Sequence, residues 1–126
     1  MNTVQKGKSA EYLVISKLLE KGYKVFPSAA EDSFIDLLYI EPSNRIVRAQ
    51  VKAFYSGSKG EYHFAVTKTH VNIKKYVKTK YTKEFVDVFI AVDLNKLEIY
   101  IIPIEFIDNY KSTISIKKIK ENFKSL

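Results

Sequence analysis

Residues 46–55 constrain the fold of this chain more than any other segment, because apolar and polar side chains alternate along them. Successive side chains of a β-strand point to opposite faces of the sheet. The alternation therefore predicts a strand with one apolar face and one polar face. The apolar side chains are Val47, Ala49, Val51 and Ala53, and the polar ones are Arg48, Gln50 and Lys52.

A long amphipathic helix is predicted before this strand. Residues 3–21 carry apolar side chains at helical spacing. Gly22 follows as a typical helix end, with Lys21 in the last turn. The predicted apolar face consists of Val4, Val14, Ile15, Leu18 and Leu19.

Further apolar runs predict additional strands. These runs are residues 23–26, 34–40, 62–66, 85–92 and 97–102. Residues 69–82 are basic and weakly favour a helix, residues 103–109 favour a helical turn, and residues 115–126 favour a basic terminal helix. This order of elements predicts an α/β fold in which helices flank a mixed central β-sheet.

Length and composition limit the classes of protein that the chain can represent. Its 126 residues fit a single domain, 1–126, whose last part, 110–126, is a basic C-terminal tail. The absence of cysteine excludes disulfides, cysteine zinc sites and a cysteine nucleophile. No apolar run is long enough for a signal-peptide core or a membrane span, so we expect no membrane partner and a cytoplasmic location, in a prokaryote or in the host cell of a virus or plasmid.

The charge of the chain favours an anionic partner. There are 21 basic and 14 acidic side chains, for a formal net charge of +7. Nucleic acid, an acidic protein and an anionic membrane are the candidate partners. Lysines concentrate in residues 65–83 and in the tail, and lysine binds phosphate without reading sequence. Because arginine is the usual reader of guanine and only Arg45 and Arg48 are present, recognition of nucleic-acid structure is favoured over recognition of sequence.

Three features break their local pattern and mark candidate chemistry. Glu11 falls among the apolar positions of the predicted helix, where an isolated buried carboxylate is costly unless a metal or a lysine pairs with it. Asp36 interrupts an apolar strand, although aspartate has a poor strand propensity. Gln50 and Lys52 share one polar strand face. The alternatives are a solvated helix edge for Glu11, an edge strand for Asp36, and a solvent-facing strand surface for Gln50 and Lys52.

In this order, the three features resemble the motifs of the PD-(D/E)xK nuclease superfamily. Residues 7–11 (Gly-Lys-Ser-Ala-Glu) look like its helix motif, residues 34–36 (Phe-Ile-Asp) look like its Asp element, and residues 50–52 (Gln-Val-Lys) look like its (D/E)-x-K. Residues 86–89 and 100–103 are similar to a small branch that includes group I intron homing endonucleases and resembles archaeal Holliday-junction resolvases. The resemblance implies a restriction-endonuclease-like fold.

The resemblance also implies a Mg²⁺-dependent DNA endonuclease that hydrolyses phosphodiester bonds, with Mn²⁺ able to substitute. The implied catalytic set is Glu11, Asp36, Gln50 and Lys52. Asp36, the side-chain oxygen of Gln50, the backbone carbonyl of Val51 and Glu11 would hold the metal, while Lys52 would orient or deprotonate the attacking water. Gln50 departs from the acid of the family motif, and its amide oxygen can ligate a hard cation but brings no charge. The alternative is a catalytically inactive nucleic-acid-binding module.

The expected substrate is duplex or branched DNA. Cleavage in the manner of a Holliday-junction resolvase is favoured, with homing or restriction-type cleavage of linear duplex as the alternative. Two cuts by a chain with one site predict a homodimer, or a tetramer. We expect the tyrosines at 55, 62, 76 and 81 to be mainly packing residues and not stacking platforms for bases. The predicted DNA-binding residues are Lys8, Arg48, Lys68, Lys74, Lys75, Lys78, Lys80 and Lys83.

Overall fold

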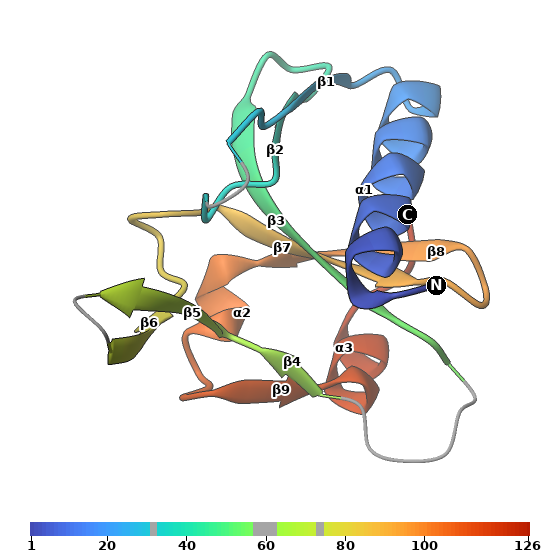
Figure 1. Ribbon diagram of the computed structural model, residues 1–126. Helices are drawn as coiled ribbons and strands as arrows, with labels where there is room; N and C mark the ends of the chain where they lie inside the picture. Colours follow the sequence, from blue (N-terminus) through green and yellow to red (C-terminus); the bar gives the residue numbers. More distant parts are fainter. Residues whose placement is uncertain (31–32, 57–62, 73–74) are drawn as a thin grey trace.

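A five-stranded mixed sheet forms the centre of the protein (Figure 1). The computed structural model describes residues 1–30, 33–56, 63–72 and 75–126. The sheet has the strand order β1-β2-β3-β7-β8, and only β3 and β7 are parallel. Its strands are β1 (Lys24–Pro27), β2 (Leu37–Ile40), β3 (Ile46–Phe54), β7 (Val88–Asp93) and β8 (Glu98–Pro103).

The predicted N-terminal helix is present as α1 (Thr3–Glu20). Asn2 caps its start, because its side chain accepts the N–H of Gln5 while the Gln5 side chain accepts the N–H of Asn2. Gly22, with φ of +86°, lets the chain leave the helix in a left-handed conformation. The helix therefore has defined ends, which position its side chains relative to the sheet.

The buried stripe of α1 differs from the predicted one. Ala10, Val14 and Leu18 are buried, whereas Val4 is 73% exposed and Leu19 is 56% exposed. Residues spaced by four lie on one side of a helix, so this stripe turns the side of Val4 and Leu19 towards solvent. The prediction that Val4 and Leu19 belong to the apolar face was wrong.

Two hydrophobic cores lie on the two faces of the sheet. One core packs α1 against β2, β3 and β7, and includes Val14, Leu37 and Ile90. The other core packs the opposite face against α2 (Ile104–Ile107), β9 (Thr113–Ser115) and α3 (Ile116–Asn122). Figure 1 shows α1 on one side of the sheet and the C-terminal elements on the other. Alternation along β3 supplies both cores, because successive side chains point to opposite faces.

A hairpin replaces the helix predicted for residues 69–82. Strands β5 (Thr67–Asn72) and β6 (Lys75–Lys80) pair antiparallel, with Thr67 opposite Lys80. Threonine and valine recur in this segment, and their branched Cβ atoms favour strands, which explains the error.

Several other predicted elements have different bounds, among them the strand predicted for residues 85–92, which is β7 and begins only at Val88. The strand predicted for residues 34–40 is shorter, so that Asp36 precedes β2 instead of lying within it. The strand predicted for residues 62–66 appears as β4 (His63–Ala65), which pairs with β9, and Tyr62 lies outside the described residues. The terminal helix is limited to α3, capped by the Ser115 side chain. Among the described residues, no helix has both the length and the apolar character needed to cross a membrane.

Candidate active site

Asp36 lies where β2 parts from β3. Its N–H donates to the Ala49 carbonyl over 2.9 Å, although the register partner of Ala49 is Leu37. Two consecutive residues thus face one residue, as in a β-bulge, an arrangement that re-aims side chains. The Asp36 carboxylate accepts the Val51 N–H through Oδ2 over 2.8 Å. This bond fixes the carboxylate beside the middle of β3.

Gln50 brings an amide to the same place. The residue is only 8% exposed, and its Oε1 has no hydrogen-bond partner among the described residues. Its Nε2 makes one long contact, 3.4 Å, with the Val51 carbonyl. A buried acceptor without a donor or a cation is costly, and such groups are rare in folded proteins. The arrangement therefore calls for a positively charged or hydrogen-bonding ligand at Oε1.

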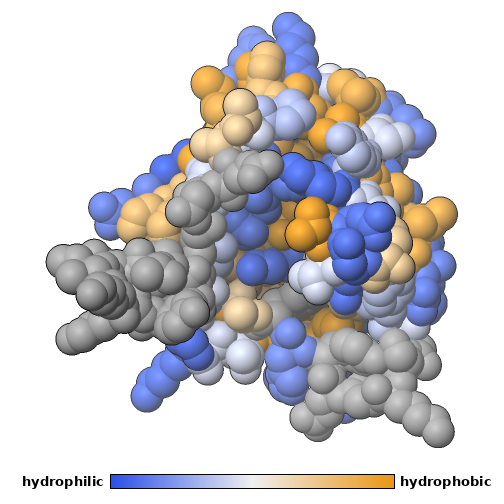
Figure 2. Space-filling view, in the orientation of Figure 1, coloured by the Kyte–Doolittle hydropathy of each residue, from blue (hydrophilic) through white to orange (hydrophobic). Residues whose placement is uncertain are grey.

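Glu11 approaches this point from α1. Its side chain is 20% exposed and lies 3.1 Å from Lys8 Nζ. Glu11 is therefore neither in the centre of the buried stripe nor fully in water: it lies at the edge of the helix. Together with Asp36, Gln50 and Val51, it lines an open pocket of about 330 Å³. Figure 2 shows hydrophilic residues around the hollow between α1 and the strands.

Lys52 follows Gln50 on the same face of β3. The register aligns Gln50 with Phe89 and Lys52 with Ala91 on the neighbouring strand β7. The Lys52 ammonium nitrogen lies 5.4 Å from the centre of the Tyr81 ring. This is within the range of a cation–π contact. The structure thus places the lysine over the face of Tyr81, a residue of the core on the side of the sheet opposite α1.

The donor set around the pocket suits a hard divalent cation. Mg²⁺ and Ca²⁺ prefer oxygen ligands from carboxylates, amides and backbone carbonyls. The pocket offers carboxylates from Asp36 and Glu11, the amide of Gln50 and the backbone of Val51. Within the described ranges, no cluster of three or more Asp, Glu, His or Cys side chains is close enough for a metal. The unpartnered Gln50 Oε1 is therefore the observation that favours a cation here.

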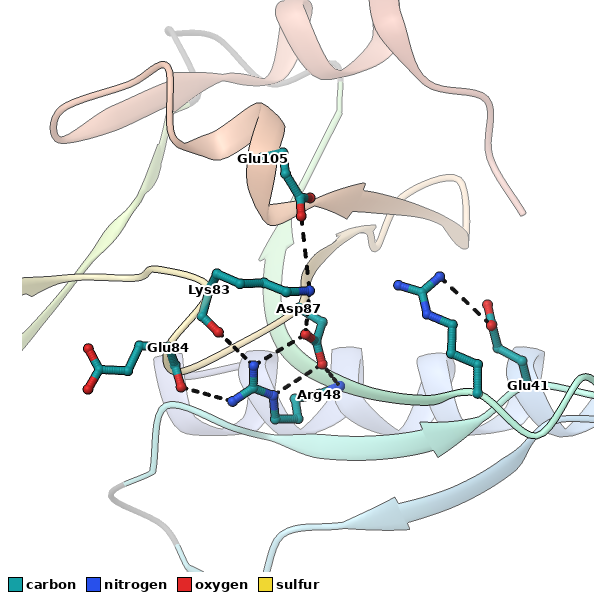
Figure 3. Close-up of polar contacts among 7 residues, drawn as sticks. Glu41, Arg48, Lys83, Glu84, Asp87 and Glu105 are labelled. Atoms are coloured by element: carbon teal, nitrogen blue, oxygen red, sulfur yellow. Dashed lines mark hydrogen bonds and ion pairs between the residues drawn. The ribbon is translucent and has the colours of Figure 1, made fainter.

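Two of the predicted DNA-binding residues, Arg48 and Lys83, are bound to other groups of the protein itself. Arg48 binds Asp87 through Nε (3.1 Å) and Nη2 (3.2 Å), and Lys83 Nζ binds the same carboxylate over 2.7 Å (Figure 3). Arg48 also donates to the carbonyls of Lys83 (2.7 Å) and Glu84 (2.9 Å). This cluster ties β3 to the segment before β7. It gives Arg48 a structural role that sequence reasoning missed.

Asp87 is the centre of this cluster. Burial alone raises the pKa of its carboxyl group, but hydrogen bonds from Arg48 and Lys83 outweigh that effect and hold the pKa well below its ordinary value. The one sequence signal for it was an acid within the apolar run 85–92, a position that the structure places directly before β7.

The other predicted DNA-binding residues are placed as follows. Lys78 is exposed, Lys80 Nζ donates to the Asp108 carbonyl over 3.2 Å, and Lys8 pairs with Glu11. The side chains of Lys68 and Lys75 lie outside the described part of the structure, as does Lys74 entirely. Their DNA-binding role stays a prediction.

Comparison with solved structures shows which fold this is. The chain is similar to a bacterial homing endonuclease, I-Ssp6803I, with a TM-score of 0.78 and 23% sequence identity, over 92% of this chain and 78% of that one. The fold is thus restriction-endonuclease-like, as the resemblance implied. A search of curated proteins finds no match.

The sequence of the chain gives the family directly. The family model described as PD-(D/E)XK endonuclease matches residues 1–125. That range contains the pocket and both cores, so the match is not confined to one motif. This chain therefore belongs to the PD-(D/E)XK endonuclease family.

Proposed function

We propose that this protein is a divalent-metal-dependent DNA endonuclease that hydrolyses phosphodiester bonds. The observation that carries the proposal is the buried Gln50 Oε1, which has no partner among the described residues and lies in the pocket with Asp36 and Glu11. Family membership supports hydrolysis of nucleic acid, and the net charge of +7 supports binding to a polyanion.

The residues of the pocket would have different roles in hydrolysis. When bound, Mg²⁺ would neutralise phosphate charge and acidify a water molecule. Asp36, Glu11, Gln50 Oε1 and the Val51 carbonyl would hold it. The Val51 N–H keeps the Asp36 carboxylate fixed, so that little reorganisation is needed when the ligand arrives.

Lys52 would add a positive charge beside the metal and its ligands. Gln50 contributes no charge, so only the Asp36 and Glu11 carboxylates balance a divalent cation. The Lys52 ammonium group would then face the scissile phosphate, orient the water and offset the charge that develops on phosphorus. Its loss should lower the rate more than the affinity for DNA.

We propose branched DNA as the substrate, in the manner of a Holliday-junction resolvase. Arg48 is held by Asp87, and Arg45 lies 3.9 Å from Glu41, so both arginines have partners within the protein. Sequence reading through arginine and guanine is correspondingly weakened. The second candidate is homing-type cleavage of linear duplex, which the structural likeness to I-Ssp6803I favours.

We further propose a homodimer, with a tetramer as the alternative, because two strands must be cut and each chain carries one set of the proposed catalytic residues Glu11, Asp36, Gln50 and Lys52. Light scattering coupled to size exclusion tests this directly. A monomer at micromolar concentration would contradict it.

A cleavage assay tests the proposed function. It compares a four-way junction, a linear duplex and single-stranded DNA, each with Mg²⁺, with Mn²⁺ and with EDTA. The variants are Asp36→Ala and Lys52→Ala, and the control is Glu121→Ala, which removes an exposed carboxylate on α3. Symmetric nicking of the junction, lost in both site variants and kept in the control, is the expected result.

Two other outcomes would change the proposal. Cleavage of the linear duplex alone would favour the homing-type function. Salt-sensitive binding without cleavage of any substrate would mean that Gln50 marks an inactive site, and the protein would then be a nucleic-acid-binding module.

A further inference from the structure

Tyr81 lies directly after the β5–β6 hairpin, in the core on the Lys52 face of the sheet. It is 2% exposed, and its N–H donates to the Val66 carbonyl over 2.9 Å. Its ring makes edge-to-face contacts with the rings of Phe34 and Phe89, with ring centres 5.1 Å and 4.9 Å away, respectively. Such contacts hold a ring in one orientation, because the positive edge of one ring meets the negative face of another.

The fixed Tyr81 ring presents a face to Lys52. The distance from Lys52 Nζ to the ring centre is 5.4 Å. A lysine side chain has a flexible four-carbon stem and loses considerable rotamer freedom when its ammonium group is held in place. A rigid aromatic face that attracts the ammonium group reduces the number of positions that the group can occupy.

Tyr81 also lies near the candidate metal ligands. Burial raises the pKa of its hydroxyl group, and the negative charge of Asp36 raises it further. The Tyr81 ring thus contacts the Lys52 ammonium group and lies within the electrostatic influence of the Asp36 carboxylate. Phe34 joins the ring contacts and precedes Asp36 by two residues in the chain, which links the ring to the loop that carries the carboxylate.

We propose that Tyr81 is a positioning residue for Lys52: its ring holds the ammonium group in the orientation that the hydrolytic step uses. This inference rests on the proposed function, because it gives the Lys52 orientation a catalytic purpose. Tyr81 touches neither phosphate nor metal in this role, and its ring, not its hydroxyl group, does the work. Phenylalanine at position 81 should therefore preserve the cleavage rate, whereas leucine should lower it.

The first test measures cleavage kinetics with Tyr81→Phe and Tyr81→Leu. We expect kcat of Tyr81→Phe to stay within about twofold of the wild type, and kcat of Tyr81→Leu to fall about tenfold with KM nearly unchanged. Tyr39→Leu is the matched control, since Tyr39 is also 2% exposed but packs in the other core, away from Lys52. All assays run below the melting temperature of the least stable variant.

The second test is independent of activity. Lysines are dimethylated with ¹³C-formaldehyde, and the Lys52 signal is assigned by its absence in Lys52→Arg. The ring current of Tyr81 should displace this signal upfield in the wild type and in Tyr81→Phe, and the displacement should vanish in Tyr81→Leu but persist in Tyr39→Leu.

The two tests separate this inference from the proposed function. A wild type that cleaves none of the substrates would refute the proposed function, while the NMR experiment would still decide whether Tyr81 holds Lys52. An ordinary lysine shift for Lys52 in the wild type would overturn the inference. Equal losses of kcat in Tyr81→Phe and Tyr81→Leu would also overturn it, since the hydroxyl group would then carry the effect.

Discussion

Replacing Gln50 by leucine should make the metal-free protein more stable and at the same time insensitive to metal. Leucine has a similar size and carries no polar atom. The substitution removes Oε1, which is buried and has no partner in the described structure, and it gives up only the 3.4 Å contact of Nε2. Loss of this one oxygen atom should therefore raise the stability of the metal-free protein and abolish its response to metal.

The magnitude follows from the cost of a buried, unsatisfied polar atom, about 1–3 kcal/mol. The 3.4 Å contact offsets little of it, because its length makes it weak. We expect Gln50→Leu to raise the free energy of unfolding without metal by about 1–2 kcal/mol, or roughly 4 °C in Tm for each kcal/mol. Wild-type protein should instead gain about 1.4 kcal/mol when Mg²⁺ is at ten times its dissociation constant, a gain that Gln50→Leu should lack.

Urea unfolding followed by circular dichroism, in EDTA and in Mg²⁺, measures both effects. Gln5→Leu is the contrasting variant, because the Gln5 amide oxygen is fully used by the helix cap and its loss should lower stability by about 0.5–1 kcal/mol. The same substitution should thus have opposite signs at the two glutamines. A Gln50→Leu protein that is less stable than the wild type in EDTA would refute the reasoning, since Oε1 would then be satisfied without a metal.

Three further predictions concern charged residues. Asp36→Ala should abolish the rise in Tm that Mg²⁺ or Mn²⁺ produces in a thermal-shift assay, whereas Lys52→Ala should retain it. Asp87→Asn should lower the free energy of unfolding by about 1–3 kcal/mol at neutral pH. Because the pKa of Asp87 is depressed in the folded protein, this difference from wild type should be complete above about pH 4 and should shrink as the pH falls below that value. Urea titrations at several pH values would measure it. Asp93 is fully buried and binds Lys120 over 3.2 Å, so Asp93→Ala should cost about 3 kcal/mol, and an unfolding energy within 1 kcal/mol of wild type would contradict this.

The polar face of β3 could be predicted from the sequence because alternation is a local signal. It put Gln50 and Lys52 on one face, and the structure confirms that placement through their register with Phe89 and Ala91. The bond from the Val51 N–H to Asp36 was not predictable in the same way. It depends on where two strands separate, and no local pattern encodes that point.

Predictions that depended on knowing which residue a side chain contacts were less successful. Arg48 looked like a surface cation, and only the fold brings Asp87 against it from a distant segment. Glu11 was expected among the buried positions of the helix, but the side of α1 that packs on the sheet is set by the shape of the sheet and not by the helix alone. The β5–β6 hairpin was missed because its basic residues hid the strand preference of its threonines and valines.

The hairpin β5–β6 is closed by residues that belong to the core. Val66 and Tyr81 stand at its two ends, both are almost completely buried, and the backbone of one binds the backbone of the other. This bond between backbone groups closes the hairpin whichever side chains the two residues carry. The hairpin is thus attached to the core at Val66 and Tyr81, and Tyr81 is also the residue whose ring contacts Lys52. A substitution at Tyr81 would therefore affect both the attachment of the hairpin to the core and the surroundings of Lys52.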